Sequence, residues 1–90
     1  MVEELSESLI EFPCHFPIKV IGEAHQDFIQ IITRLIKEHI HNFIDKKIES
    51  KMSSEGKFIS LTCTIYVTSK QQLDLIYKDL SAHPMTKFVL

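Results

Sequence analysis

Histidine is the residue type in this sequence best suited to metal binding, and His39 and His41 lie only two positions apart. The other histidines are His15, His25 and His83. A tetrahedral zinc site needs ligands that converge, usually with cysteine or carboxylate beside histidine. Residues two apart on a helix do not share a face, so the side chains of His39 and His41 are expected to diverge. We therefore predict no metal site and expect solvated histidines at a helix C-terminus, where the helix dipole favours positive charge.

Cysteine beside histidine is the other arrangement that could do chemistry, because a base can activate a thiol for nucleophilic attack. Cys14 and His15 are adjacent, but neighbouring residues of an extended segment point to opposite sides. Cys63 lies in an alternating apolar stretch, which predicts a small buried hydrophobe. The two cysteines form no CxxC pair, so both are expected to be free thiols. Because Gly56-Lys57 also lacks the rest of a phosphate-binding loop, we predict that the protein is not an enzyme and uses no cofactor.

The length and composition are those of a single folded domain. The chain has 90 residues, of which 44% are hydrophobic and 24% charged, the balance of a soluble globular fold. A chain this short buries only about 60–65% of its unfolded surface, which leaves little core from which to cut a deep active-site cleft. The net charge of −2 gives no general attraction for nucleic-acid phosphates. No apolar run approaches the ~18 residues of a membrane span, so we predict a cytoplasmic protein without a membrane segment.

The charge is concentrated at the start of the sequence. Four glutamates and no lysine or arginine occur in the first twelve residues. Pro13 and Pro17 then break any helix and lead into an extended segment. We predict an acidic N-terminal arm over residues 1–12 and a single domain over residues 13–90.

The spacing of apolar residues predicts six elements in this domain. The predicted strands cover 16–21, 43–52, 58–68 and 85–90, and the predicted helices cover 24–39 and 69–83. Gly22 closes the first strand, and Ser69 with Gln72 forms a capping box that opens the second helix. The second strand is heavily charged, which favours a sheet edge, where lysines discourage pairing with another chain.

The order strand, helix, strand, strand, helix, strand predicts an α+β fold, the ferredoxin-like βαββαβ sandwich. Right-handed crossovers place the first and third strands in the centre of a four-stranded antiparallel sheet, with both helices on one face. The other face is then open and of mixed polarity. Its expected residues are Lys19, Ile21, Ser60, Thr62, Thr64 and Tyr66.

Two aromatic residues make RNA binding a hypothesis to consider, since an RRM of this topology stacks bases on aromatics of its central strands. Phe58 and Tyr66 could face outward, but residues 57–62 lack the aromatic-rich RNP pattern and no basic stripe accompanies them. Nucleic acid is therefore the least favoured partner. The threonine-rich face fits a binding module that forms a homodimer through its sheet or an edge and holds a ligand at the seam. It fits equally a monomer whose threonines meet water.

Three stretches resemble one family, the YbeD-like small bacterial proteins. Residues 11–22, EFPCHFPIKVIG, resemble the family pattern E-F-P-x-x-F-x-x-K-V-x-G. Residues 53–62, SSEGKFISLT, resemble S-S-x-G-x-[FY]-x-S-[VL]-[ST], and residues 88–90 match the family's last residues. The resemblance covers nearly the whole chain and implies an ACT-like variant of the ferredoxin-like fold with a regulatory role. Members are proposed lipoate-binding regulators, so it also implies a small carboxylate ligand or a protein partner.

The same resemblance implies a position for the ligand. In ACT-like modules, ligands lie where the first strand turns into the first helix, against a neighbouring subunit. This implies a ligand site at Gly22, Glu23, Ala24 and His25, where exposed amides of a helix N-terminus would attract a carboxylate. The alternative is an ordinary strand-to-helix turn. We expect a small non-catalytic regulatory or ligand-binding module first, a protein-interaction adaptor second and an RNA-binding module third.

Overall fold

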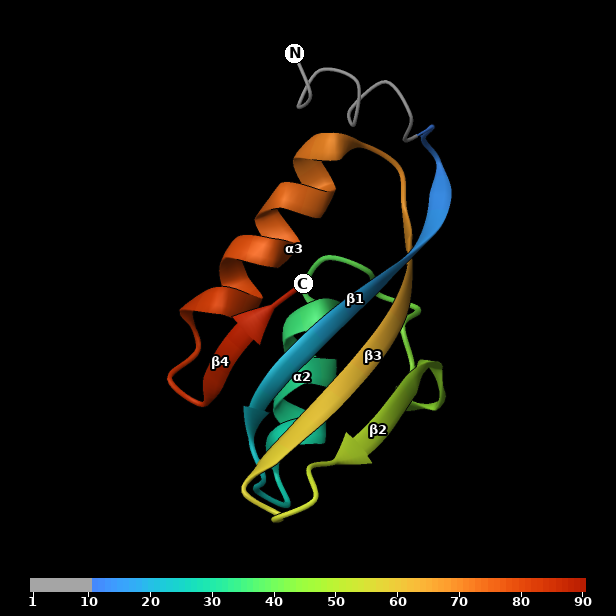
Figure 1. Cartoon of the computed structure of the whole chain (residues 1–90). Coiled ribbons are helices and arrows are strands. Elements are labelled where there is room, and N and C mark those ends of the chain that lie inside the picture. Colours follow the sequence, from blue (N-terminus) through green and yellow to red (C-terminus); the bar gives the residue numbers. More distant parts are fainter. Residues whose placement is uncertain (1–10) are drawn as a thin grey trace.

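The computed structural model describes residues 11–90, and its elements follow the order βαββαβ (Figure 1). The strands are β1 (Cys14–Glu23), β2 (Ile48–Met52), β3 (Phe58–Val67) and β4 (Thr86–Val89). The helices are α2 (Phe28–Lys37) and α3 (Lys70–Ala82), and a short 3₁₀ helix, η1 (Asp45–Lys47), precedes β2. No helix within residues 11–90 is long and apolar enough to cross a membrane. The predicted acidic arm falls mainly on residues 1–10, outside the described residues.

The four strands form one antiparallel sheet in the order β2-β3-β1-β4. The central strands β1 and β3 pair along their whole length, from Cys14 opposite Val67 to Glu23 opposite Phe58. Both helices lie on one face of this sheet (Figure 1). The ferredoxin-like α+β sandwich predicted from the sequence is therefore confirmed, with β2 and β4 at the edges.

The core lies between the sheet and the helices, because alternate residues of the central strands point toward α2 and α3. On β3 the buried residues are Ile59, Leu61, Cys63, Ile65 and Val67. The helices meet them with residues at three- and four-residue spacing. These are Phe28, Ile32 and Ile36 of α2, and Leu73, Ile76 and Leu80 of α3. The opposite face of the sheet carries no helix of the described residues (Figure 1).

The first helix starts later than the sequence predicts. The prediction began it at Ala24, whereas β1 runs to Glu23 and α2 begins at Phe28. The backbone amide of Glu23 donates to the carbonyl of Met85 at 3.0 Å, and the amide of Ala24 donates to the carbonyl of Lys57 at 3.2 Å. These long-range hydrogen bonds hold the segment against the sheet, so the helix begins only after it.

The second strand is also shorter than predicted. The segment 43–52 was expected to be one strand, but β2 begins at Ile48. Phe43 is only 4% exposed and belongs to the core between helices and sheet. The chain then makes η1, where the amide of Lys47 donates to the carbonyl of Ile44 at 3.0 Å. Because Phe43 is anchored in the core, the chain reaches the edge of the sheet only at Ile48.

The start of α3 shows half of the predicted capping box. The Ser69 hydroxyl accepts a hydrogen bond from the amide of Gln72 at 3.2 Å, as a helix N-cap should. The Gln72 side chain, however, accepts from the amide of Thr68 at 2.8 Å and not from that of Ser69. The reciprocal bond is therefore shifted by one residue, and it fixes the connection from β3 into α3.

Candidate functional site

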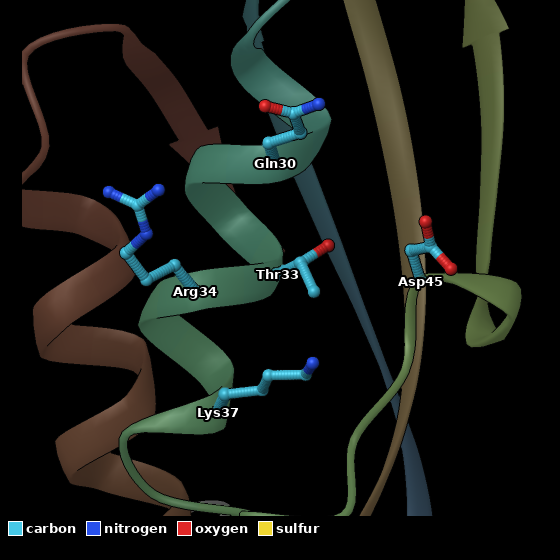
Figure 2. A pocket seen from close by; sticks show the side chains of 5 residues that line it. All are labelled: Gln30, Thr33, Arg34, Lys37 and Asp45. Atoms are coloured by element: carbon cyan, nitrogen blue, oxygen red, sulfur yellow. The ribbon is translucent and has the colours of Figure 1, made fainter.

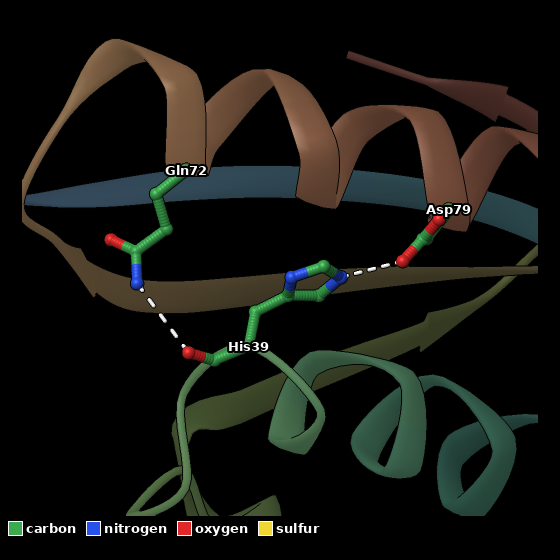
Figure 3. Close-up of polar contacts among 3 residues, drawn as sticks. All are labelled: His39, Gln72 and Asp79. Atoms are coloured by element: carbon green, nitrogen blue, oxygen red, sulfur yellow. Dashed lines mark hydrogen bonds and ion pairs between the residues drawn. The ribbon is translucent and has the colours of Figure 1, made fainter.

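His39 joins the two helices and is not the solvated residue that the sequence predicted (Figure 3). Its Nε2 lies 2.5 Å from Oδ2 of Asp79 on α3, and its side chain is 20% exposed. The side-chain amide of Gln72 donates to the backbone carbonyl of His39 at 3.4 Å. His41 is exposed. The contacts of His39 thus give it a structural role at the end of α2.

Cys14 and His15 lie on opposite sides of β1, as the alternation predicts. Cys14 is half-buried, lies opposite Val67 and packs against the core. The ring of His15 lies beside that of Tyr66, with 4.9 Å between the ring centroids. Burial raises the pKa of the Cys63 thiol to about 12, so it is protonated at neutral pH. Within residues 11–90, no group of three or more histidine, cysteine or acidic side chains is placed to hold a metal ion.

The helix-free side of the sheet, called the open face from here on, carries several large apolar side chains. Phe58 and Tyr66 of β3 are 42% and 47% exposed, and Phe88 of β4 is 65% exposed. Phe88 pairs with Ile21 of β1, so apolar groups of two strands adjoin there. Phe58 lies at the same end of the β1–β3 pair, opposite Glu23, whereas Tyr66 lies toward the other end, opposite His15. Clustered exposed apolar side chains on a surface often mark a binding site. The open face is therefore the leading candidate for a binding surface.

A pocket of about 380 Å³ lies where the β2-β3 hairpin meets β1 on this face. We call it the hairpin pocket, and its lining residues are Ile21, Lys51, Met52, Ser53, Ser54, Phe58, Ile59 and Ser60. Ser60 of β3 lies opposite both Ile21 of β1 and Lys51 of β2. The three residues therefore lie side by side in one row across the sheet. The walls from Ile21 and Phe58 on the open face are apolar, and Lys51 supplies a cation among serine residues. Met52 and its strand partner Ile59 belong to the helix side of the hairpin and border the pocket from there. Apolar walls with few polar groups are typical of small-molecule sites.

The predicted site at residues 22–25 lies beside this pocket but does not line it. Glu23 pairs with Phe58, which is a wall of the pocket. The helix N-terminus that was expected to offer free amides is not there, because the amides of Glu23 and Ala24 are bonded within the sheet and α2 starts at Phe28. His25 accepts a hydrogen bond at Nδ1 from the amide of Asp27 at 3.1 Å. The physical reason given for that site is therefore wrong, and the hairpin pocket beside it is the better-formed candidate.

A second pocket, of about 290 Å³, lies between α2 and the segment before β2 (Figure 2). Its lining residues are Gln30, Thr33, Arg34, Lys37 and Asp45. In Figure 2, Thr33 and Lys37 point toward Asp45, whereas Arg34 points toward α3. All five side chains are polar, so a ligand would displace water from charged groups without burying apolar surface. This pocket is the weaker candidate.

Sequence reasoning missed Lys51, Met52, Ser53 and Ser54 as site residues. It treated the first two as part of a charged edge strand and the serines as turn formers. The available signal was the predicted hairpin turn over residues 53–57. Closing that turn brings Lys51 opposite Ser60 and Ser53 beside Phe58.

Comparison with known proteins identifies relatives over nearly the whole sequence. A family model described as "Protein of unknown function (DUF493)" matches residues 7–90. A UPF0250 protein of Janthinobacterium sp. (strain Marseille) is 48% identical over 85 residues, covering 94% of this chain and 93% of its own. The UPF0250 protein NE1487 of Nitrosomonas europaea is 45% identical over 84 residues, covering 93% of this chain and 97% of its own.

The fold is also found in a solved structure. The solution structure of protein HP0495 from H. pylori superposes with a TM-score of 0.75 and covers 90% of this chain and 85% of its own. Its sequence is 22% identical to this one, so the likeness concerns the fold alone.

Proposed function

Because this chain belongs to the DUF493 family, the YbeD-like UPF0250 proteins, we propose that it is a small non-catalytic regulatory module that binds a small carboxylate ligand in the hairpin pocket. The family description assigns no function, so the proposal rests on this chain's own residues. The observation that carries it is the composition of the pocket: the apolar side chains of Ile21 and Phe58 on the open face, beside Lys51.

The lining of the pocket suggests the chemical class of the ligand. An alkyl chain of moderate length would lie against Phe58 and Ile21 and remove apolar surface from water. A carboxylate at one end would meet Lys51 and the hydroxyls of Ser53 and Ser60, and charge-assisted hydrogen bonds of this kind are stronger than neutral ones. Octanoate and lipoate have this shape. The two free thiols, Cys14 and Cys63, support our placing the protein in the reducing cytoplasm.

Thermal unfolding with graded ligands tests the proposal. Octanoate at ten times its dissociation constant should stabilise the fold by about 1.4 kcal/mol, which raises Tm by roughly 6–10 °C. Acetate lacks the chain and octanamide lacks the charge, so both should stabilise less. If octanoate gives no more stabilisation than acetate at any concentration, the proposed ligand class is wrong.

A matched pair of variants locates the effect. Phe58→Ala removes a wall of the hairpin pocket, whereas Tyr66→Ala removes a similarly exposed aromatic from the same strand, away from that pocket. We expect the ligand-induced stabilisation to fall in Phe58→Ala and to persist in Tyr66→Ala. Equal responses in the two variants would place binding elsewhere.

An adaptor that binds another protein is the second candidate. Phe88 and Leu90 are each 65% exposed, and both belong to the chain on the β4 side of the open face. Exposed apolar residues on a rigid sheet are suitable anchors for a protein partner. Phe88→Ser should then reduce recovery of a co-purifying protein relative to the wild type, as measured by quantitative mass spectrometry. Unchanged recovery would remove this candidate.

A further inference from the structure

The β2 strand is an edge strand with one side available for pairing. It lies at the end of the sheet, and only Ile48 among its five residues is half-buried while the rest are exposed. Figure 1 shows β2 at the margin of the sheet, with no helix of the described residues stacked on it. An edge strand presents unpaired backbone N–H and C=O groups to its surroundings.

The hydrogen-bond pattern identifies which backbone groups are free. The amide of Ser53 donates to the carbonyl of Phe58 at 2.8 Å, so these residues form a hydrogen-bonded pair. Hydrogen-bonded and non-bonded pairs alternate along antiparallel strands. By this alternation Lys51 and Glu49 bond to β3. The backbone groups of Ser50 and Met52 and the carbonyl of Ile48 then point to the free edge, whereas the amide of Ile48 already donates to the carbonyl of Asp45.

The sequence of β2, Ile-Glu-Ser-Lys-Met, is self-complementary about its central residue. We propose that two copies of this chain form a dimer by antiparallel pairing of their β2 strands, with Ser50 opposite Ser50 of the second copy. Glu49 then lies opposite Lys51 of the second copy on the open face. Ile48 lies opposite Met52 of the second copy on the helix side.

Backbone hydrogen bonding and side-chain charge both favour the register centred on Ser50 over registers centred on Glu49 or Lys51. The favoured register joins Ser50 to Ser50 of the second copy by reciprocal hydrogen bonds, and the Met52 amide of each copy donates to the Ile48 carbonyl of the other. Glu49 and Lys51 fall at non-bonded positions, where opposed side chains come closest. A register centred on Glu49 or on Lys51 would set like charges directly opposite each other, which is destabilising.

In the proposed dimer, the lysine of β2 favours association with a second copy. Lysine on an edge strand generally discourages association, which is what the sequence predicted for this segment. Lys51, however, alternates with Glu49, so each ammonium meets a carboxylate in the proposed register. Because Lys51 also lines the hairpin pocket, the second copy would bring Glu49 to its rim. The dimer does not depend on ligand binding, and it can be tested without any ligand.

Charge reversal gives a direct test by sedimentation equilibrium, over protein concentrations from about 10 μM to 1 mM. The wild type should associate with increasing concentration. Glu49→Lys and Lys51→Glu should each weaken the dimer about ten-fold or more, since two attractive pairs become repulsive. The double variant carrying both changes should restore the dimer, because opposite charges face each other again.

Mixing the two single variants provides a second readout that does not depend on either forming a dimer alone. Glu49→Lys places two lysines on the strand and Lys51→Glu places two glutamates, so the mixture should form a heterodimer. Ser50→Pro removes an outward amide without removing a bond to β3, and it should abolish association while circular dichroism shows a folded protein. A wild type that stays monomeric at 1 mM overturns the proposal. A dimer that charge reversal and Ser50→Pro leave unchanged also overturns it.

Discussion

Gly22 is the residue whose replacement by alanine tests the packing of this fold most sharply. It is buried next to the end of β1, and a Cβ atom built there would lie 2.4 Å from Cζ of Phe28 and 2.6 Å from the carbonyl oxygen of Met85. Phe28 is fully buried in the core, so its ring has little room to move. The Met85 oxygen belongs to the backbone and accepts the Glu23 amide, so it cannot rotate away.

The cost of Gly22→Ala follows from these two contacts. Overpacking a core costs about 1–3 kcal/mol, and a clash that includes backbone falls at the upper end of this range. We expect a loss of about 2–3 kcal/mol in the free energy of unfolding and a Tm lower by roughly 10–20 °C. Urea denaturation followed by circular dichroism measures both the midpoint and its slope.

Two further variants separate the causes. Gly56→Ala is the matched control, because a Cβ there meets no atom within 4 Å but the residue has φ +73°. It should cost only about 1 kcal/mol, from backbone strain. Phe28→Leu combined with Gly22→Ala should cost less than the sum of the single changes, since the smaller side chain relieves part of the clash. If Gly22→Ala loses less than about 0.5 kcal/mol, the close approach described here is wrong.

Two other predictions concern side chains of the core and of the helix contact. The folded-state pKa of Cys63 is raised from an ordinary 9.0 to about 12, so the free energy of unfolding should hold below pH 9 and fall by about 1 kcal/mol per pH unit above it. Urea titrations at pH 8 to 11 should show this slope in the wild type and a smaller one in Cys63→Ala, and equal slopes would contradict the assignment. A double-mutant cycle with His39→Ala and Asp79→Ala should give a coupling of about 0.5–1 kcal/mol, because Asp79 is 42% exposed and its charge is partly screened. A coupling of zero would show that the contact in Figure 3 adds nothing to stability.

The sequence predicted the parts of the fold that local patterns determine. β3 alternates apolar and polar residues from Phe58 to Val67, and its buried side and central place agree with the prediction. The three- and four-residue spacing of Phe28, Ile31, Ile32, Leu35 and Ile36 predicted the core-facing side of α2. Phe28, Ile32 and Ile36 are buried, whereas Ile31 and Leu35 are half-buried. These signals depend only on the periods of strand and helix.

Features that depend on contacts distant in sequence were not predictable. The start of α2 was misplaced because the amides of Glu23 and Ala24 bond to Met85 and Lys57, which lie far along the chain. His39 was expected in solvent because its partner, Asp79, lies forty residues away.

The candidate site also depends on contacts between residues distant in sequence, so it was not predictable from local patterns. The hairpin pocket combines Ile21 of β1 with residues of the β2-β3 hairpin, and its shape follows from the register between three strands. The resemblance to ACT-like modules pointed to residues 22–25, which border the pocket through Glu23 but do not form it.

The most direct test of the proposed function is an amide NMR titration of the whole protein with octanoate. Saturable shifts should centre on Ile21, Lys51, Met52 and Phe58 if octanoate binds in the hairpin pocket. Shifts confined to the charged pocket around Lys37, or no saturable shift up to the solubility limit of octanoate, would contradict the proposed function.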